Sequence, residues 1–194
     1  MIGQRPPSEP VQSANVGAFR FATEDGKRFV QISAANFIYQ TNDPYTGWHD
    51  FRKKLTDLWS LSAGEINAEA ITKIGLRYIN RVVMSPAHPN IRDWLQSTAD
   101  LPASLMASEG HFFARIEVSP ASLHLRLMTV GLEAPGPDWP LGSILLDIDR
   151  STTEPCETDE AVLKCLEHLH EDIWVAFDSA ATSNLKNRLN GKLE

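Results

Sequence analysis

The run KIGLRYINRVV, residues 73–83, decides the fold of this chain, because it alternates as a β-strand does and places both of its arginines on one face. One face carries the apolar residues with a tyrosine and an asparagine: Ile74, Leu76, Tyr78, Asn80 and Val82. The opposite face carries Gly75, Arg77, Ile79, Arg81 and Val83. The pattern predicts a strand that covers a core with its first face and presents Arg77 and Arg81 on its second.

Other strands are predicted on both sides of this run. Residues 19–32 form a hairpin around an Asp-Gly pair, which supplies the positive φ that tight turns need. Residues 111–118 and 122–128 form a second hairpin, expected to have one apolar and one mostly polar face. Residues 143–150 form a further strand that turns Asp147 and Asp149 away from its apolar side.

Two helices complete the expected fold. Apolar residues at helical spacing predict an amphipathic helix over residues 46–59. A longer helix begins after Thr158, a good N-cap, and is expected to break near residues 179–183 before a short last helix that ends at Gly191. Together these elements predict an α+β fold with two layers, in which a mainly antiparallel sheet packs against a middle helix and a long C-terminal helix.

Composition limits the class of protein. The 194 residues, 42% hydrophobic and 22% charged, suit one globular domain over residues 18–194 behind a flexible leader at 1–17. The chain has no apolar run of about 20 residues and no secretory signal, so we expect a cytoplasmic protein that does not enter membranes. Its two cysteines, Cys156 and Cys165, are expected to be free thiols. A net charge of −7 argues against broad nucleic-acid binding, although a small basic patch stays open.

Four segments together resemble a sporadically distributed, uncharacterised bacterial protein family. They are YTGW at 45–48, IGLRYINR at 74–81, LHEDI at 169–173 and LKNR at 185–188, and the likeness runs from Phe19 to the C-terminus. Members of that family are longer and have an additional N-terminal strand and helix, whereas only the polar leader precedes Phe19 here. The resemblance implies no assigned activity and no catalytic residue. The family's sporadic distribution hints at accessory genes, such as defence or toxin-neutralising systems.

The first candidate site is the arginine face of the strand at 73–83. Arg77 and Arg81 could hold carboxylates or phosphates. The wider candidate set for binding adds Tyr45, Trp48, Arg115 and Arg126. The simpler interpretation pairs these arginines with Glu117, Asp147 or Asp149 on neighbouring strands, and it places Arg115 and Arg126 on similar faces to Arg77 and Arg81.

A second candidate site is acidic. Asp147, Asp149 and Glu117 could share acid and base duties or hold a divalent metal in a small hydrolase. On the C-terminal helix, the Glu167–His170 and Cys165–His168 pairs lack the further ligands that a di-iron or zinc site needs, so a solvent-facing helix explains them better. The chain has no nucleophile elbow and no phosphate loop.

The sequence therefore favours a binding or interaction module over an enzyme, with no cofactor and no metal. An acidic chain suits a basic protein partner, which this one would neutralise or regulate, and homo-oligomerisation stays open. One alternative is the metal-dependent hydrolase built on the acidic cluster. The other is a sensor that holds an anionic small ligand between the sheet and the helix at 48–59.

Overall fold

The computed structural model describes residues 17–62, 66, 70–96, 112–121 and 123–190. The expected leader, apart from Gly17, and the expected helix end at Gly191 lie outside the described residues. The chain divides into two compact units, Met1–Glu69 and Ala70–Glu194. Helices accompany two antiparallel sheets, which confirms the α+β class. The assignment of residues 18–194 to a single domain stays a prediction.

In the described part of the first unit, a three-stranded antiparallel sheet is accompanied by a helix. The strands β1 (Ala18–Ala22), β2 (Arg28–Ser33) and β3 (Phe37–Thr41) follow in chain order. The predicted hairpin is confirmed as β1 and β2, and its turn uses Gly26 with a φ of 68°. The helix α1 (Trp48–Ser62) confirms the predicted middle helix, and its rings meet those of β3 in the Phe37–Trp59 and Tyr39–Phe51 pairs, each with centroids 5.4 Å apart.

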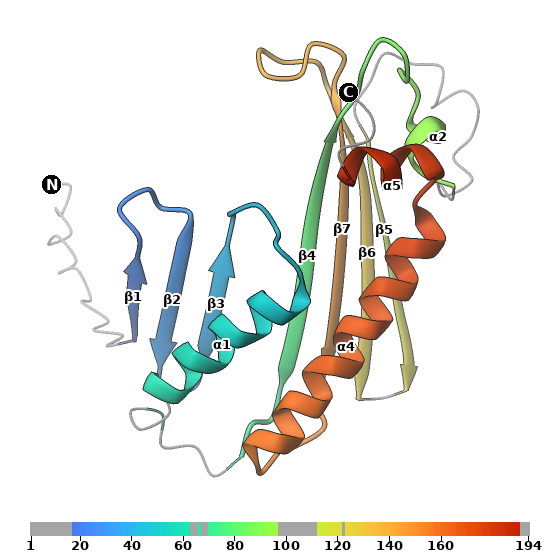
Figure 1. Cartoon of the computed structure of the whole chain (residues 1–194). Coiled ribbons are helices and arrows are strands. Elements are labelled where there is room, and N and C mark those ends of the chain that lie inside the picture. The colour runs from blue at the N-terminus through green and yellow to red at the C-terminus, as the bar shows by residue number, and fades with distance from the viewer. Residues whose placement is uncertain (1–16, 63–65, 67–69, 97–111, 122, 191–194) are drawn as a thin grey trace, which may run out of the picture. The chain divides into compact units, whose positions relative to one another are not determined.

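The second unit holds a four-stranded antiparallel sheet in the order β4-β7-β6-β5 (Figure 1). Its strands are β4 (Ile74–Val83), β5 (Phe112–Ala121), β6 (His124–Glu133) and β7 (Ser143–Thr152). The two predicted faces of β4 are confirmed, because Ile74, Leu76 and Val82 are buried while Arg77 and Arg81 are exposed. The central strand β7 pairs along its whole length with β4 on one side and with β6 on the other.

Among its described residues this unit has the helices α2 (Ile91–Trp94), α4 (Asp159–Ala180) and α5 (Ser183–Leu189). The N-cap of α4 is Thr158, as predicted, and its hydroxyl accepts from the Ala161 N–H at 3.2 Å. The expected break lies between α4 and α5. There the hydroxyl of Thr182 accepts from the Leu185 N–H as the N-cap of α5 and donates to the carbonyl of Asp93 in α2 at 2.6 Å. Within the described residues, no helix is long and apolar enough to cross a membrane.

The core of the second unit lies between the sheet and α4, which packs against β4 and β7. Ile144, Leu146 and Ile148 of β7 are fully buried, and Leu166, Leu169 and Ile173 form the buried stripe of α4. Burying a side chain of this size contributes about 1.5–3 kcal/mol relative to leaving it in water. This layer therefore fixes which face of the sheet α4 covers and which face it leaves uncovered.

The hairpin of β5 and β6 differs from the expected one. Val118 lies opposite Arg126 but Ala121 lies opposite His124, so β5 contains one residue more than β6 in this stretch. A β-bulge of one residue exchanges the two faces of a strand relative to its partner. Ile116 and Val118 therefore share a face with Met128 and Arg126, and the prediction of one apolar face for the whole hairpin is wrong.

Candidate functional site

The candidate site is the face of the four-stranded sheet turned away from α4, which we call the open face. Alternation along each strand brings to it the odd-numbered residues, Arg77, Ile79 and Arg81 of β4 among them. The same rule adds Asp147 and Asp149 of β7, which lie beside β4. The predicted arginine face and the predicted acidic cluster thus meet on one surface.

Arg77 and Asp147 form a bidentate ion pair at the centre of the open face. The Arg77 Nε donates to Asp147 Oδ1 at 2.8 Å, and the Nη2 donates to Oδ2 at 2.6 Å. The side chain of Asp147 is 7% exposed and that of Arg77 is 55% exposed, so the arginine covers a buried carboxylate. This hydrogen bonding raises the pKa of the Arg77 guanidinium. The pairing matches the simpler of the two interpretations made for the arginine.

Arg81 forms an ion pair with Glu133, a carboxylate that was not among the predicted partners. It spans β7 to reach Glu133 at the end of β6, with the Nε to Oε2 distance at 2.9 Å and the Nη2 to Oε1 distance at 3.1 Å. Ser143 donates a third hydrogen bond to Glu133, and these contacts, Ser143 first and Arg81 second, lower the pKa of the carboxyl. Trp139 lies 5.0 Å from the guanidinium carbon of Arg81. Alternation puts Glu133 on the same side of β6 as Leu127, the side expected to be apolar, so only the register with β7 places it on this face.

The predicted acidic cluster does not form a common site. Glu117 pairs with Arg115 on its own strand at 3.2 Å, and Leu127 lies between Glu117 and Asp149 in the cross-strand register. Asp149 forms no ion pair or side-chain hydrogen bond among the described residues, and burial raises its pKa. Within the described part of the chain, no group of three His, Cys, Asp or Glu residues could hold a metal ion.

The other predicted binding residues lie in separate places. Arg115 shares the open face, but Arg126 lies on the opposite face, where its Nε donates to Asp172 of α4 at 2.7 Å. The expectation that it faces the same way as Arg77 is wrong, because Arg126 is an even-numbered residue opposite Arg150 of β7. Tyr45 and Trp48 belong to the first unit, where the Trp48 ring stacks on Phe51 with centroids 6.0 Å apart.

Exposed apolar side chains complete the open face. Ile79 of β4 and Phe113 of β5 are each 59% exposed, and Val83 is 36% exposed. The Phe113 ring lies over Gly131 of β6, since a Cβ on that glycine would come within 2.5 Å of the ring. The glycine therefore lets an aromatic side chain lie flat on the sheet.

The polar residues that the sequence analysis considered on α4 form contacts with the sheet. The His170 ring meets Tyr78 of β4 edge-on at 6.1 Å, and burial lowers the pKa of His170. Cys165 is a free thiol, and burial, followed by the nearby Cys156, raises its pKa to about 11. At neutral pH this thiol is protonated, so it is a poor nucleophile and a poor metal ligand.

Both guanidiniums of β4 already donate to carboxylates, so the open face is not arranged to hold a free phosphate or carboxylate. It instead presents exposed apolar side chains between ion pairs. No family model, no curated protein and no solved structure matches this chain.

Proposed function

We propose that this protein is a binding module that docks a partner protein on the open face of its four-stranded sheet. The observation that carries the proposal is the exposure of Ile79, Val83 and Phe113 among ion-paired charges. These side chains lie on the two edge strands, β4 and β5, with polar and charged residues between them. Exposed apolar side chains that alternate with polar groups are a common feature of protein interaction surfaces. The ion pairs Arg77–Asp147 and Arg81–Glu133 hold their long side chains in place, which reduces the entropy lost on binding.

The partner we propose has a basic surface. The chain carries a net charge of −7, and on the open face Asp149 is a carboxylate without an ion-pair partner among the described residues. A basic side chain of the partner that reached Asp149 would stabilise its charged form, which burial disfavours. Neutralising or regulating such a protein, as in a bacterial toxin-related or defence system, agrees with this charge and with the family resemblance.

A carboxylate-based hydrolase has less support. Asp147 is bound by Arg77, and Glu117 is separated from Asp149 by Leu127. Two carboxylates that divide acid and base duties must both reach one substrate bond. This separation favours binding over catalysis on the open face.

The test is pairwise co-expression of the protein with the products of its neighbouring genes. We expect one of these products, a protein with an isoelectric point above about 9, to co-purify with the wild-type chain. Ile79→Ser should weaken that complex at least about tenfold, because it removes an exposed apolar side chain beside the Arg77–Asp147 ion pair on the docking surface.

The matched control is Val175→Ser, which removes a β-branched side chain that is 64% exposed on α4. It should leave the complex unchanged. Equal loss of binding with both variants, or an acidic partner, would contradict the proposal. A homodimer detected by sedimentation and lost with Ile79→Ser would assign the open face to a second copy of the chain instead.

A further inference from the structure

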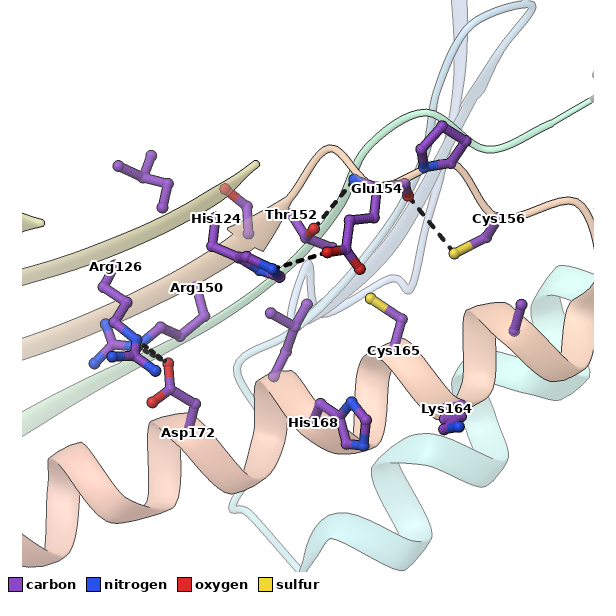
Figure 2. Close-up of a pocket in the computed structure, with 15 residues that line it drawn as sticks. His124, Arg126, Arg150, Thr152, Glu154, Cys156, Lys164, Cys165, His168 and Asp172 are labelled. Carbon is purple, nitrogen blue, oxygen red and sulfur yellow. Dashed lines mark hydrogen bonds and ion pairs between the residues drawn. The ribbon is translucent and has the colours of Figure 1, made fainter. Parts of the chain in front are cut away.

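A pocket of about 590 Å³ lies on the other face of the sheet, between β6, β7 and residues 161–172 of α4 (Figure 2). This volume is typical of sites for small organic ligands, which fall between about 300 and 1,000 Å³. Pro155, Ala161 and Leu169 give it apolar walls, and Arg126, Arg150 and Asp172 lie together at one end, which we call the charged end (Figure 2). Arg126 and Arg150, the two arginines at the charged end, both lie on the face covered by α4 and not on the open face.

Two arginines dominate the charged end of the pocket. Arg126 and Arg150 are directly opposite each other in the register of β6 and β7. Like charges in this position repel, and both side chains turn to one oxygen of Asp172 (Figure 2), with Nε to Oδ2 distances of 2.7 and 2.8 Å. A single carboxylate oxygen therefore accepts hydrogen bonds from both guanidiniums.

Arg150 is buried although it carries a full charge. Its side chain is 7% exposed, and its Nη1 donates to the carbonyls of Leu127 and Asp149, at 3.0 Å each. The Nη2 of Arg150 and both terminal nitrogens of Arg126 make no hydrogen bond to another described residue. The pocket thus contains donors of the kind that bind planar carboxylates and phosphates in pairs.

The charges of the pocket are not balanced. Arg126, Arg150 and Lys164 line it with Asp172 and Glu154, so three cations face two carboxylates, and Glu154 is within 3.0 Å of the His124 ring. With its histidines neutral, the pocket has an excess of one positive charge on a chain whose net charge is −7. An anion would remove this excess and the repulsion between the arginines.

We propose that this pocket binds the carboxylate or phosphate group of a small organic anion, held by the terminal nitrogens of Arg126 and Arg150. The apolar walls would contact the rest of the ligand. This site differs from the sensor pocket expected beside the helix at 48–59, because its residues come from β6, β7 and α4. A carboxylate and a phosphate would be recognised by the same guanidinium donors, and binding measurements distinguish between them.

The experiment is calorimetric titration of the protein with inorganic phosphate and, separately, with succinate, at constant ionic strength set by sodium chloride. We expect saturable binding of at least one of the two anions. Arg126→Gln should weaken that binding about tenfold, since it removes a charged, two-nitrogen donor. Arg126→Lys keeps the charge but not the planar donor pair, so it should also weaken binding.

The matched control is Arg115→Gln, which changes the net charge equally on the opposite face of the sheet. It should bind as the wild type does. Saturation by phosphate alone or by succinate alone would support the proposal and identify the group. The proposal is overturned if neither anion saturates the protein, or if Arg115→Gln weakens binding as much as Arg126→Gln. Neither result bears on the docking surface, which is tested through Ile79.

Discussion

Arg77 and Arg150 stand on neighbouring strands and each binds a carboxylate, but they lie on opposite faces of the sheet and are buried in opposite ways. On the open face the arginine is 55% exposed and its partner Asp147 is 7% exposed. On the face covered by α4 the arginine is 7% exposed and its partner Asp172 is 28% exposed. The same type of ion pair therefore shields a buried anion on one face and a buried cation on the other.

The two faces differ in which member of the ion pair depends on the other. An ion that remains in contact with water loses little when its partner is removed, whereas a buried ion left alone is costly. On the open face the exposed arginine stabilises the buried carboxylate. On the covered face the arginine is the buried group, and carbonyls of β6 and β7 supplement its single carboxylate oxygen.

The largest effect is expected for Arg150→Met, which keeps much of the side-chain volume and removes the charge. We expect the free energy of unfolding to fall by about 3 kcal/mol, because the carbonyls of Leu127 and Asp149 lose their buried donor and Asp172 loses a partner. Urea unfolding followed by circular dichroism measures the change. Arg126→Met is the matched control, since Arg126 binds the same oxygen but is 48% exposed, and we expect a loss of about 1 kcal/mol or less. Equal losses would remove the distinction between the two faces.

A smaller effect is expected for Arg77→Met on the open face. The substitution leaves Asp147 buried without its ion pair, so stability should fall by about 1–2 kcal/mol. Adding Asp147→Leu should restore most of the loss, because the uncompensated charge is then gone. The double-mutant cycle is measured by urea unfolding. Arg115→Met is the exposed control, and we expect it to lose about 0.5 kcal/mol of stability or less. Failure of Asp147→Leu to restore stability would show that packing of the arginine stem, and not charge, is what matters.

The smallest effect is expected for Asp149→Asn. Burial raises the folded-state pKa of Asp149 above its unfolded value, so the ionised carboxylate disfavours folding at neutral pH. The variant should be more stable than the wild type by about 0.5 kcal/mol or less at pH 7. As the pH falls from the folded pKa towards the unfolded one, the folded wild type binds the proton first and gains stability. The difference in stability between Asp149→Asn and the wild type should then disappear, and urea midpoints at neutral and at acidic pH check this. A gap that widened on acidification would contradict the assignment.

Much of the second unit was predictable because its local patterns are strong. The faces of β4, the cap at Thr158 and the break before α5 follow from alternation, capping chemistry and helix length. In the first unit the five-residue strand β3 was missed although β1 is as short, since residues 34–36 before β3 contain no Asp-Gly or Asn-Gly turn signal. The faces of the β5–β6 hairpin were mispredicted because a single inserted residue between Val118 and Ala121 leaves no clear signal in the sequence.

The candidate site was predicted only in part, for a reason that concerns strand order. Arg77–Asp147 follows once β4 and β7 are neighbours, but the pairing of Arg81 with Glu133 requires β6 to lie directly beyond β7. The pocket under α4 was not predicted either. Arg126, Arg150 and Asp172 are far apart in the sequence, and only the order of the strands and the placement of α4 bring them to one oxygen.

The α+β class, the two faces of the arginine-bearing strand, the ends of the long helix and the acidic net charge follow from the amino-acid sequence alone. These are local or additive properties, which depend on side-chain period, capping and composition. The carboxylate that each arginine binds, the burial of the charges and the position of the pocket depend instead on the tertiary structure. Strand order, a one-residue bulge and the packing of α4 on β4 and β7 set those features, because they bring together residues that no local pattern connects.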